Sequence, residues 1–88
     1  MTREETLDKA KAVVTKDRND QYGNPEQNFG LIASFWSAYL GIPIPPEKVS
    51  VMLVMMKCAR TKHKVSDDTW IDIAGYAACG AEVMEVQE

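Results

Sequence analysis

Residues 66–81 read Ser-Asp-Asp-Thr-Trp-Ile-Asp-Ile-Ala-Gly-Tyr-Ala-Ala-Cys-Gly-Ala, and this stretch decides the fold. Ser66 is a favourable N-cap, because its hydroxyl can accept a hydrogen bond from a free backbone N–H of the first helical turn. Asp67 and Asp68 follow where the helix dipole favours negative charge. Apolar and small residues then recur at spacings of three and four, which predicts a helix from residue 67 to about 85. One face of this helix is mostly alanine and admits close neighbours: Ile73, Ala74, Ala77, Ala78, Ala81 and Met84.

Two carboxylates share one side of this predicted helix. Asp68 and Asp72 are four residues apart, a spacing that stacks side chains on the same helical face. Gly75, Cys79 and Glu82 continue roughly along that side. Stacked carboxylates in a small helical protein are the strongest chemical hint in the sequence.

Two helices are predicted in the first half of the chain. Thr2 and Glu5 form a capping box at the start of a helix that should reach about residue 17. Asn24 caps a second helix over residues 25–40, which begins with a proline and ends at a glycine.

A third helix is predicted from about residue 46 to about residue 60. It follows the stiff linker 42–46, whose three prolines disfavour helical backbone before them. Four helices with short connections predict an all-α fold, a compact four-helix bundle forming a single domain over residues 1–88.

The distribution of apolar residues predicts which helices are buried. The third helix is apolar on all sides from Val49 to Met56, apart from Ser50, and is expected to be the central one. The broad apolar stripe of the second helix should be covered on two sides, by other helices or by a second subunit. Trp70 is expected in the core. Because 45% of only 88 residues are hydrophobic, we expect a homodimer or a higher homo-oligomer.

Charge is divided unevenly along the chain. Residues 57–64 carry four bases and no acid, whereas residues 67–88 carry six acids and no base. These charges complement the two helix dipoles at the junction. Lys57 follows an apolar run, so it should be partly buried and paired with a carboxylate of the last helix. The net charge of −3 argues against nucleic-acid binding across the whole surface.

Targeting and redox signals indicate a cytoplasmic protein, in the host cell if the chain is phage-encoded. No signal peptide is visible, and the longest apolar run is too short for a membrane span. Cys58 and Cys79 lie in apolar helical patterns without a zinc-ligand spacing, which predicts reduced core thiols.

The polar candidates for a functional site fall into three pairs. If the last three helices pack up-down-up, all three pairs should meet at one end of the bundle. Carboxylates from two helices can hold Mg²⁺, and a lysine with an arginine can bind phosphate oxygens. The alternative is a structural ion-pair network that ties the third helix to the fourth. The three pairs are Glu26 with Asn28, Lys57 with Arg60, and Asp68 with Asp72.

Four segments of the chain resemble a family of small phage and prophage proteins of unassigned function. Family members share the patterns YGxPExNF, WSAYLG, KxAR and DSWVDIAGYA. The resemblance covers roughly residues 15 to 83. The matching segments here are Asp20-Gln21-Tyr22-Gly23-Asn24-Pro25-Glu26-Gln27-Asn28-Phe29, Phe35-Trp36-Ser37-Ala38-Tyr39-Leu40-Gly41, Lys57-Cys58-Ala59-Arg60 and Asp68-Thr69-Trp70-Ile71-Asp72-Ile73-Ala74-Gly75-Tyr76.

More distantly, the arrangement is similar to the all-α MazG-like and dUTPase-like nucleoside triphosphate pyrophosphohydrolases. This resemblance implies an oligomer that uses Mg²⁺ on helix carboxylates to split nucleotides into monophosphate and pyrophosphate. Asp68 and Asp72 would correspond to the second acidic pair of that superfamily, with the spacing D-x-x-x-D instead of E-x-x-D. The usual E-x-x-E motif is missing, since the second helix offers only Glu26.

These observations predict a phage-type nucleotide-phosphate-binding protein, with Mg²⁺-dependent pyrophosphohydrolysis as its chemistry. In that hypothesis Glu26, Asp68 and Asp72 hold the metal and form the catalytic set. The substrate-binding residues would be Lys57 and Arg60 on the phosphates, with Tyr22, Asn28 or Trp36 on the base or sugar. The rival hypothesis is a non-catalytic phage accessory or interaction protein whose charged residues form structural ion pairs.

Overall fold

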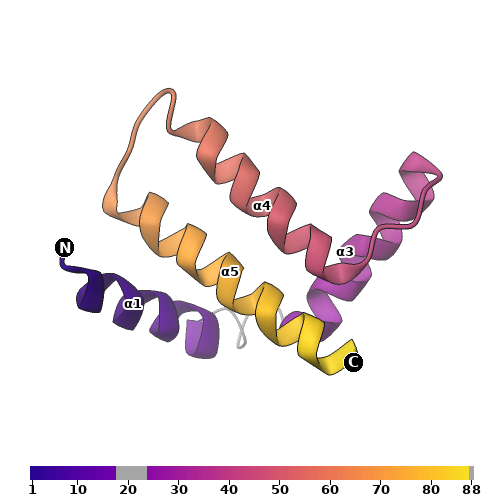
Figure 1. The fold of residues 1–88 in the computed structure, drawn as a ribbon, viewed down its shortest axis with the longest axis horizontal. Coiled ribbons are helices and arrows are strands. Elements are labelled where there is room, and N and C mark those ends of the chain that lie inside the picture. Colours follow the sequence, from indigo (N-terminus) through magenta and orange to yellow (C-terminus); the bar gives the residue numbers. More distant parts are fainter. Residues whose placement is uncertain (18–23, 88) are drawn as a thin grey trace.

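The computed structural model describes residues 1–17 and 24–87, without the side chains of Asp17, Glu26, Val86 and Gln87. Figure 1 shows how the α-helices are arranged. They are α1 (Arg3–Ala12), α3 (Pro25–Leu40), α4 (Pro46–Arg60) and α5 (Asp67–Gln87), and a π-helical turn, η1 (Val13–Asp17), extends α1. The described residues contain no strand, so the predicted all-α class and the four predicted helices are confirmed.

The predicted capping residues account for the helix starts in the first half of the chain. The Thr2 hydroxyl accepts from the Glu5 N–H at 3.1 Å, and the Glu5 carboxylate accepts from the Thr2 N–H at 3.0 Å. At the start of α3, the Asn24 side chain accepts from the Gln27 N–H at 3.1 Å. The helix ends at Gly41, whose φ of 71° is the left-handed conformation that glycine adopts without strain.

At the start of α5, the capping hydrogen bond has a different donor and acceptor from those expected. The helix begins at Asp67 as predicted, but the hydrogen bond formed there runs from the Ser66 N–H to the Thr69 hydroxyl, at 3.2 Å. Thr69 thus plays the part that Glu5 plays in α1, reaching back to the residue before the helix.

The last turn of the first helix widens into η1. Val13, Val14 and Thr15 are all β-branched, and such side chains crowd the preceding helical turn. The Thr15 hydroxyl also donates to the Lys11 carbonyl at 2.6 Å, which competes with the backbone for that acceptor. The helix still reaches residue 17, as predicted.

Helices α4 and α5 form an antiparallel pair that runs through the molecule (Figure 1). Ser50 is buried and donates its hydroxyl hydrogen to the Tyr76 carbonyl. A methyl group at Gly80 would lie 2.7 Å from Ser50 Cβ, so the two helix backbones approach closely there. The close contact is therefore made at Gly80 and not on the predicted alanine face, of which Ala77, Ala78, Ala81 and Met84 are exposed.

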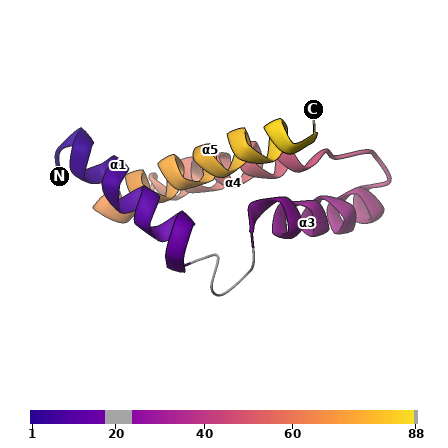
Figure 2. The same cartoon turned by 90° about the horizontal axis from the view of Figure 1, so that it is seen from below.

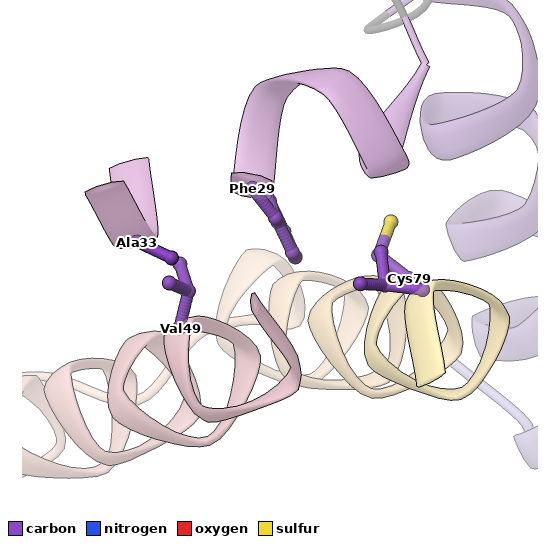
Figure 3. Close-up of a cluster of buried hydrophobic side chains, with 5 residues drawn as sticks. Phe29, Ala33, Val49 and Cys79 are labelled. Carbon is purple, nitrogen blue, oxygen red and sulfur yellow. The ribbon is translucent and has the colours of Figure 1, made fainter. Parts of the chain in front are cut away.

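Helices α1 and α3 lie against this pair without forming a regular bundle with it. Figure 2 shows α3 on one side of the layer made by α4 and α5, with α1 descending toward the same side. Phe29 and Ala33 point from α3 toward Val49 of α4 and Cys79 of α5 (Figure 3). Val83 completes this small core, which Trp36 and other partly buried residues surround.

Several expectations about burial are wrong. Trp70 is 53% exposed, and Met55 of the helix expected to be central is 57% exposed. Cys58 is exposed, and only Cys79 is a core thiol. The radius of gyration is 13.5 Å, against about 12 Å expected for a compact chain of this length. The helices thus form a more open arrangement than the predicted compact bundle, because α3 meets α4 and α5 near one end only.

Over the described part of the chain, no helix combines the length and apolarity needed to cross a membrane.

Candidate functional site

Lys57 and Asp72 join α4 to α5 through an ion pair. Lys57 Nζ lies 2.6 Å from Asp72 Oδ2, and the two side chains are 17% and 22% exposed. The apolar residues before Lys57 bring the methylene stem of its side chain between α4 and α5. Asp72 lies opposite Lys57 on α5. The prediction that Lys57 pairs with a carboxylate of the last helix is confirmed.

Arg60 and Asp68 lie near this pair but at the surface. Both residues are exposed, Arg60 in the last turn of α4 and Asp68 in the first turn of α5. Asp68 is one turn from Asp72, so the two carboxylates share a side of α5 as expected. The end of the α4–α5 pair therefore carries exposed charge of both signs.

The start of α3 lies elsewhere. Phe29 packs against Cys79 and Val83, which follow Asp72 by seven and eleven residues in α5. At 1.5 Å per residue, this separates the first turns of α3 from Asp72 by about 10–16 Å along the helix. The expectation that all three polar pairs meet at one end is therefore wrong, because α3 packs beside the C-terminal half of α5.

The remaining predicted site residues are Tyr22, Glu26, Asn28 and Trp36. Glu26 is in the first turn of α3, but its side chain is outside the described part of the chain, as is all of Tyr22. Asn28 is half-buried in the same helix, two turns before Trp36. Trp36 packs against the hydrophobic core, which gives its ring a structural role already.

Within the described ranges, no three His, Cys, Asp or Glu side chains are grouped closely enough to hold a metal ion. Mg²⁺ prefers octahedral oxygen ligation and binds proteins through one or two carboxylates plus waters and substrate phosphates. Here Asp72 Oδ2 is engaged by an ammonium group at 2.6 Å, and Asp68 faces solvent. The predicted three-carboxylate site also needs the Glu26 side chain, which lies outside the described part of the chain, so this site stays a prediction and we derive no reaction step through a metal.

A groove between α4 and α5 was missed by sequence reasoning. Its volume is about 430 Å³, and the residues that line it are mostly apolar. Glu47 lies at one end, and within the described structure its Oε2 atom is buried without a hydrogen-bond partner. The apolar pattern around α4 predicts a core helix, although part of that pattern faces this open groove. The apolar lining residues are Val51, Val54, Met55, Ala77, Ala81 and Met84.

The chain matches a protein-family model and curated phage proteins. The family described as "Domain of unknown function (DUF6378)" matches residues 5–84. The Gene 55 protein of Mycobacterium phage D29 is 36% identical over 86 residues, and the Gene 55 protein of Mycobacterium phage L5 is 37% identical over 84 residues. These alignments cover 93% of this chain but 55% and 53% of the relatives, so the chain spans about half their length. No solved structure matches.

These matches support the expected relation to phage proteins of unassigned function. The more distant likeness to MazG-like pyrophosphohydrolases stays a prediction.

Proposed function

The chain belongs to the family described as Domain of unknown function (DUF6378), and on this premise we propose that it is a non-catalytic protein-interaction domain. In this proposal its partly buried charges hold the helices together, and its exposed apolar faces bind protein. This is the accessory-protein alternative drawn from the sequence.

The observation that carries the proposal is the amount of large apolar surface left open on the helices. Leu31, Phe35 and Tyr39 are spaced by four on α3 and are 59%, 67% and 89% exposed. The α4–α5 groove adds a second apolar face. Contiguous apolar patches are rare on soluble monomers and mark interaction sites.

The Lys57–Asp72 pair supports the non-catalytic half of the proposal. Lys57 Nζ lies 2.6 Å from Asp72 Oδ2, so a cation bound at that oxygen would have to compete with the lysine. Removing either partner would leave a partly desolvated charge, which is the behaviour of a structural ion pair. The pair also joins the two helices that approach closely at Ser50 and Gly80.

The experiment is a thermal melt of the chain with and without Mg²⁺, against a panel of nucleoside mono- and triphosphates. A ligand present at 100 times its dissociation constant would stabilise the folded state by about 2.7 kcal/mol. For a domain of this size, such stabilisation raises Tm by well over 10 °C. We expect no shift with any nucleotide, with metal or without it.

The nucleotide-phosphate and pyrophosphohydrolase hypothesis is the outcome that would overturn this proposal. It requires Asp72 to exchange Lys57 for Mg²⁺ and the Glu26 side chain or a second subunit to supply a further ligand. A Tm shift that needs both Mg²⁺ and one class of triphosphate, and that disappears in Asp72→Asn, would establish it. The variant Asp8→Asn, which changes an exposed carboxylate of α1, is the matched control and should retain any such shift.

A further inference from the structure

We infer that the outward face of α3 binds a second copy of this chain, in a two-fold dimer whose α3 helices cross. The face consists of a row of large side chains with a row of small residues beside it. The large row is Leu31, Phe35 and Tyr39, and the small row is Gly30, Ser34 and Ala38. This inference rests on the proposed interaction function and names the partner for one of its faces.

Both rows lie on the side of α3 that is turned away from the hydrophobic core. Phe29 and Ala33 point from α3 into that core (Figure 3). Successive residues of an α-helix are rotated by about 100°, so Leu31 and Phe35 lie opposite these two core residues. The small row runs directly beside the large one. The centre of the face is therefore the part of α3 farthest from α4 and α5.

Exposed apolar area is concentrated on this face. The three side chains of the large row are between 59% and 89% exposed. Because an aromatic side chain buries about 150–250 Å² when it is covered, Phe35 and Tyr39 alone leave roughly 300 Å² open. The whole face presents on the order of 500 Å² per copy, so a dimer would bury about 1,000 Å² in total. That is the lower limit for a specific interface, and we therefore expect a weak dimer with a micromolar Kd.

The face carries no charge that a second copy would repel. A two-fold contact sets a surface against its own copy, so any charge near the axis meets the same charge. Glu26 in the first turn is the only charged residue in the sequence of α3, and the next one along the chain is Glu47. Helices α1, α4 and α5 each have at least two exposed charged residues. Of the four helices, α3 is therefore the one best suited to face its own copy.

The two rows are complementary in shape. Residues four apart form ridges on a helix, and such ridges fit into the grooves of a second helix at a crossing angle of about −50°. A two-fold axis parallel to the rows places the large row of each copy over the small row of the other. This axis keeps residues at the same height, so Phe35 lies over the partner's Ser34. The contact requires an uncharged helix with one large and one small row, and α3 itself is such a helix.

The local hydrogen bonds of α3 also favour a covered face. The Ser34 hydroxyl donates to the Gly30 carbonyl at 3.0 Å, so this hydroxyl stays paired when a side chain of the partner lies over it. The Ile44 N–H donates to the Ser37 hydroxyl at 2.8 Å, which ties the connection before α4 back to α3. A face that is held in place before binding loses less conformational entropy when the partner arrives.

The first test is the mass of the chain by sedimentation equilibrium over a range of concentrations. We expect a rise from 9.8 kDa toward twice that mass across the micromolar range. Phe35→Glu should keep the monomer mass throughout, because it sets two carboxylates near the two-fold axis. Met55→Glu in the α4–α5 groove is the matched control, since Met55 is 57% exposed and Phe35 67%; it should leave the dimer intact. Circular dichroism checks that both variants keep their helices.

The second test separates a fitted contact from general apolar association. Ser34→Phe adds apolar surface but fills the small row, so it should weaken the dimer by about tenfold or more. Ala12→Phe adds the same side chain at an exposed position of α1 and should leave the Kd within about threefold of the original. A face that associates only because it is apolar would instead be strengthened by Ser34→Phe.

The third test restores the contact between two different variants. Phe35→Ala removes the large side chain from both contacts of its own dimer and should weaken it by about tenfold or more. In a mixture with Ser34→Phe, one contact combines the filled small row with the truncated large row, and the other contact is the original one. The mixed dimer should therefore be about tenfold stronger than either variant alone. Sedimentation velocity with one of the two chains fluorescently labelled measures it.

The outcomes separate this inference from the proposed function. A chain that stays monomeric, a dimer that survives Phe35→Glu or is lost in Met55→Glu, a dimer strengthened by Ser34→Phe, or a mixture without rescue would each overturn the α3 interface. Any of these with no nucleotide-dependent Tm shift would leave the interaction function standing with another partner. A dimer that meets all three tests, together with a Mg²⁺-dependent nucleotide shift, would overturn the proposed function and keep the interface.

Discussion

Ser50 of α4 and Gly80 of α5 meet so closely that a Cβ atom built on Gly80 would lie 2.7 Å from Ser50 Cβ and 2.5 Å from Ser50 Oγ. Ser50 is only 3% exposed, and its hydroxyl donates to the Tyr76 carbonyl one turn earlier in α5. A β-carbon cannot swing aside as a long side chain can, so the helix spacing depends on the absence of a side chain at position 80.

Gly80→Ala should therefore destabilise the fold, although alanine is the better helix former by about 1 kcal/mol. Overpacking a close contact costs about 1–3 kcal/mol, so after the helix gain we expect a net loss of up to about 2 kcal/mol in the free energy of unfolding. Urea denaturation followed by circular dichroism measures it.

The matched control is Gly75→Ala in the same helix. There the new methyl group would meet one side-chain methyl, Val14 Cγ1, at 2.9 Å, and no β-carbon. Gly75→Ala should therefore cost less than Gly80→Ala. Equal losses in the two variants would show that the Ser50 contact does not set the helix spacing.

The Lys57–Asp72 ion pair predicts a coupled effect on stability. Both side chains are partly exposed, so the loss should fall below the 3–5 kcal/mol of a fully buried pair. We expect Asp72→Asn and Lys57→Met each to lower the free energy of unfolding by about 1–3 kcal/mol. The double variant should lose less than the sum, since neither charge remains unpaired.

The measurement is a double-mutant cycle from urea denaturation. Lys62→Met, at an exposed base in the turn after α4, should change stability by less than about 0.5 kcal/mol. Additive losses from Lys57→Met and Asp72→Asn would contradict the ion pair.

Local features of the fold are predictable from the sequence because they depend on neighbouring residues. The capping box at Thr2 and Glu5, the Asn24 cap and the ending of α3 at Gly41 each follow from interactions within one helical turn. The pairing of Lys57 with a carboxylate on α5 is predictable because an apolar run carries the lysine stem into the structure.

The arrangement of the helices is not predictable in the same way. Periodicity shows that α4 has apolar residues all round, but it does not tell whether they face a core or an open groove. The pattern therefore places Met55 and Trp70 in the core, although each is more than half exposed. The relative position of the candidate site residues is also not predictable. It depends on how α3 crosses α5, and that crossing depends on how Phe29 and Ala33 fit against neighbouring helices. No spacing within α3 encodes that contact.

The capping box of α1 predicts a small acid dependence of stability. The Thr2 N–H donates to the Glu5 carboxylate, and this hydrogen bond, with that of the Thr2 side chain, lowers the pKa of Glu5 below its usual value. A group whose pKa is lower in the folded state stabilises it above the unfolded-state pKa. This contribution is lost as the pH falls through the lowered pKa.

The pKa of Glu5 can be followed directly by NMR of its side-chain carboxyl carbon. The apparent pKa should lie below that of glutamate in an unfolded peptide, and Thr2→Ala should bring it back toward that value. Glu5→Gln should remove its part of the acid dependence of helix melting. Thr2→Ala keeps the backbone N–H of residue 2, so an unchanged pKa in this variant would rule out the Thr2 hydroxyl as a cause and leave the backbone hydrogen bond.

Alanine substitutions at Gly30 inside α3 and at Gly41 after it should change stability in opposite directions. A methyl group added at Gly30 or Gly41 would have no neighbouring atom within 4 Å, so packing contributes nothing at either site. Gly41 has a φ of 71°, a conformation that costs an L-residue about 1–2 kcal/mol. Gly30 lies inside α3, where alanine is preferred by about 1 kcal/mol.

Gly41→Ala should therefore lower Tm, and Gly30→Ala should raise it by several degrees, as measured by thermal denaturation. If both substitutions moved Tm in the same direction, the left-handed ending of α3 at Gly41 would be wrong.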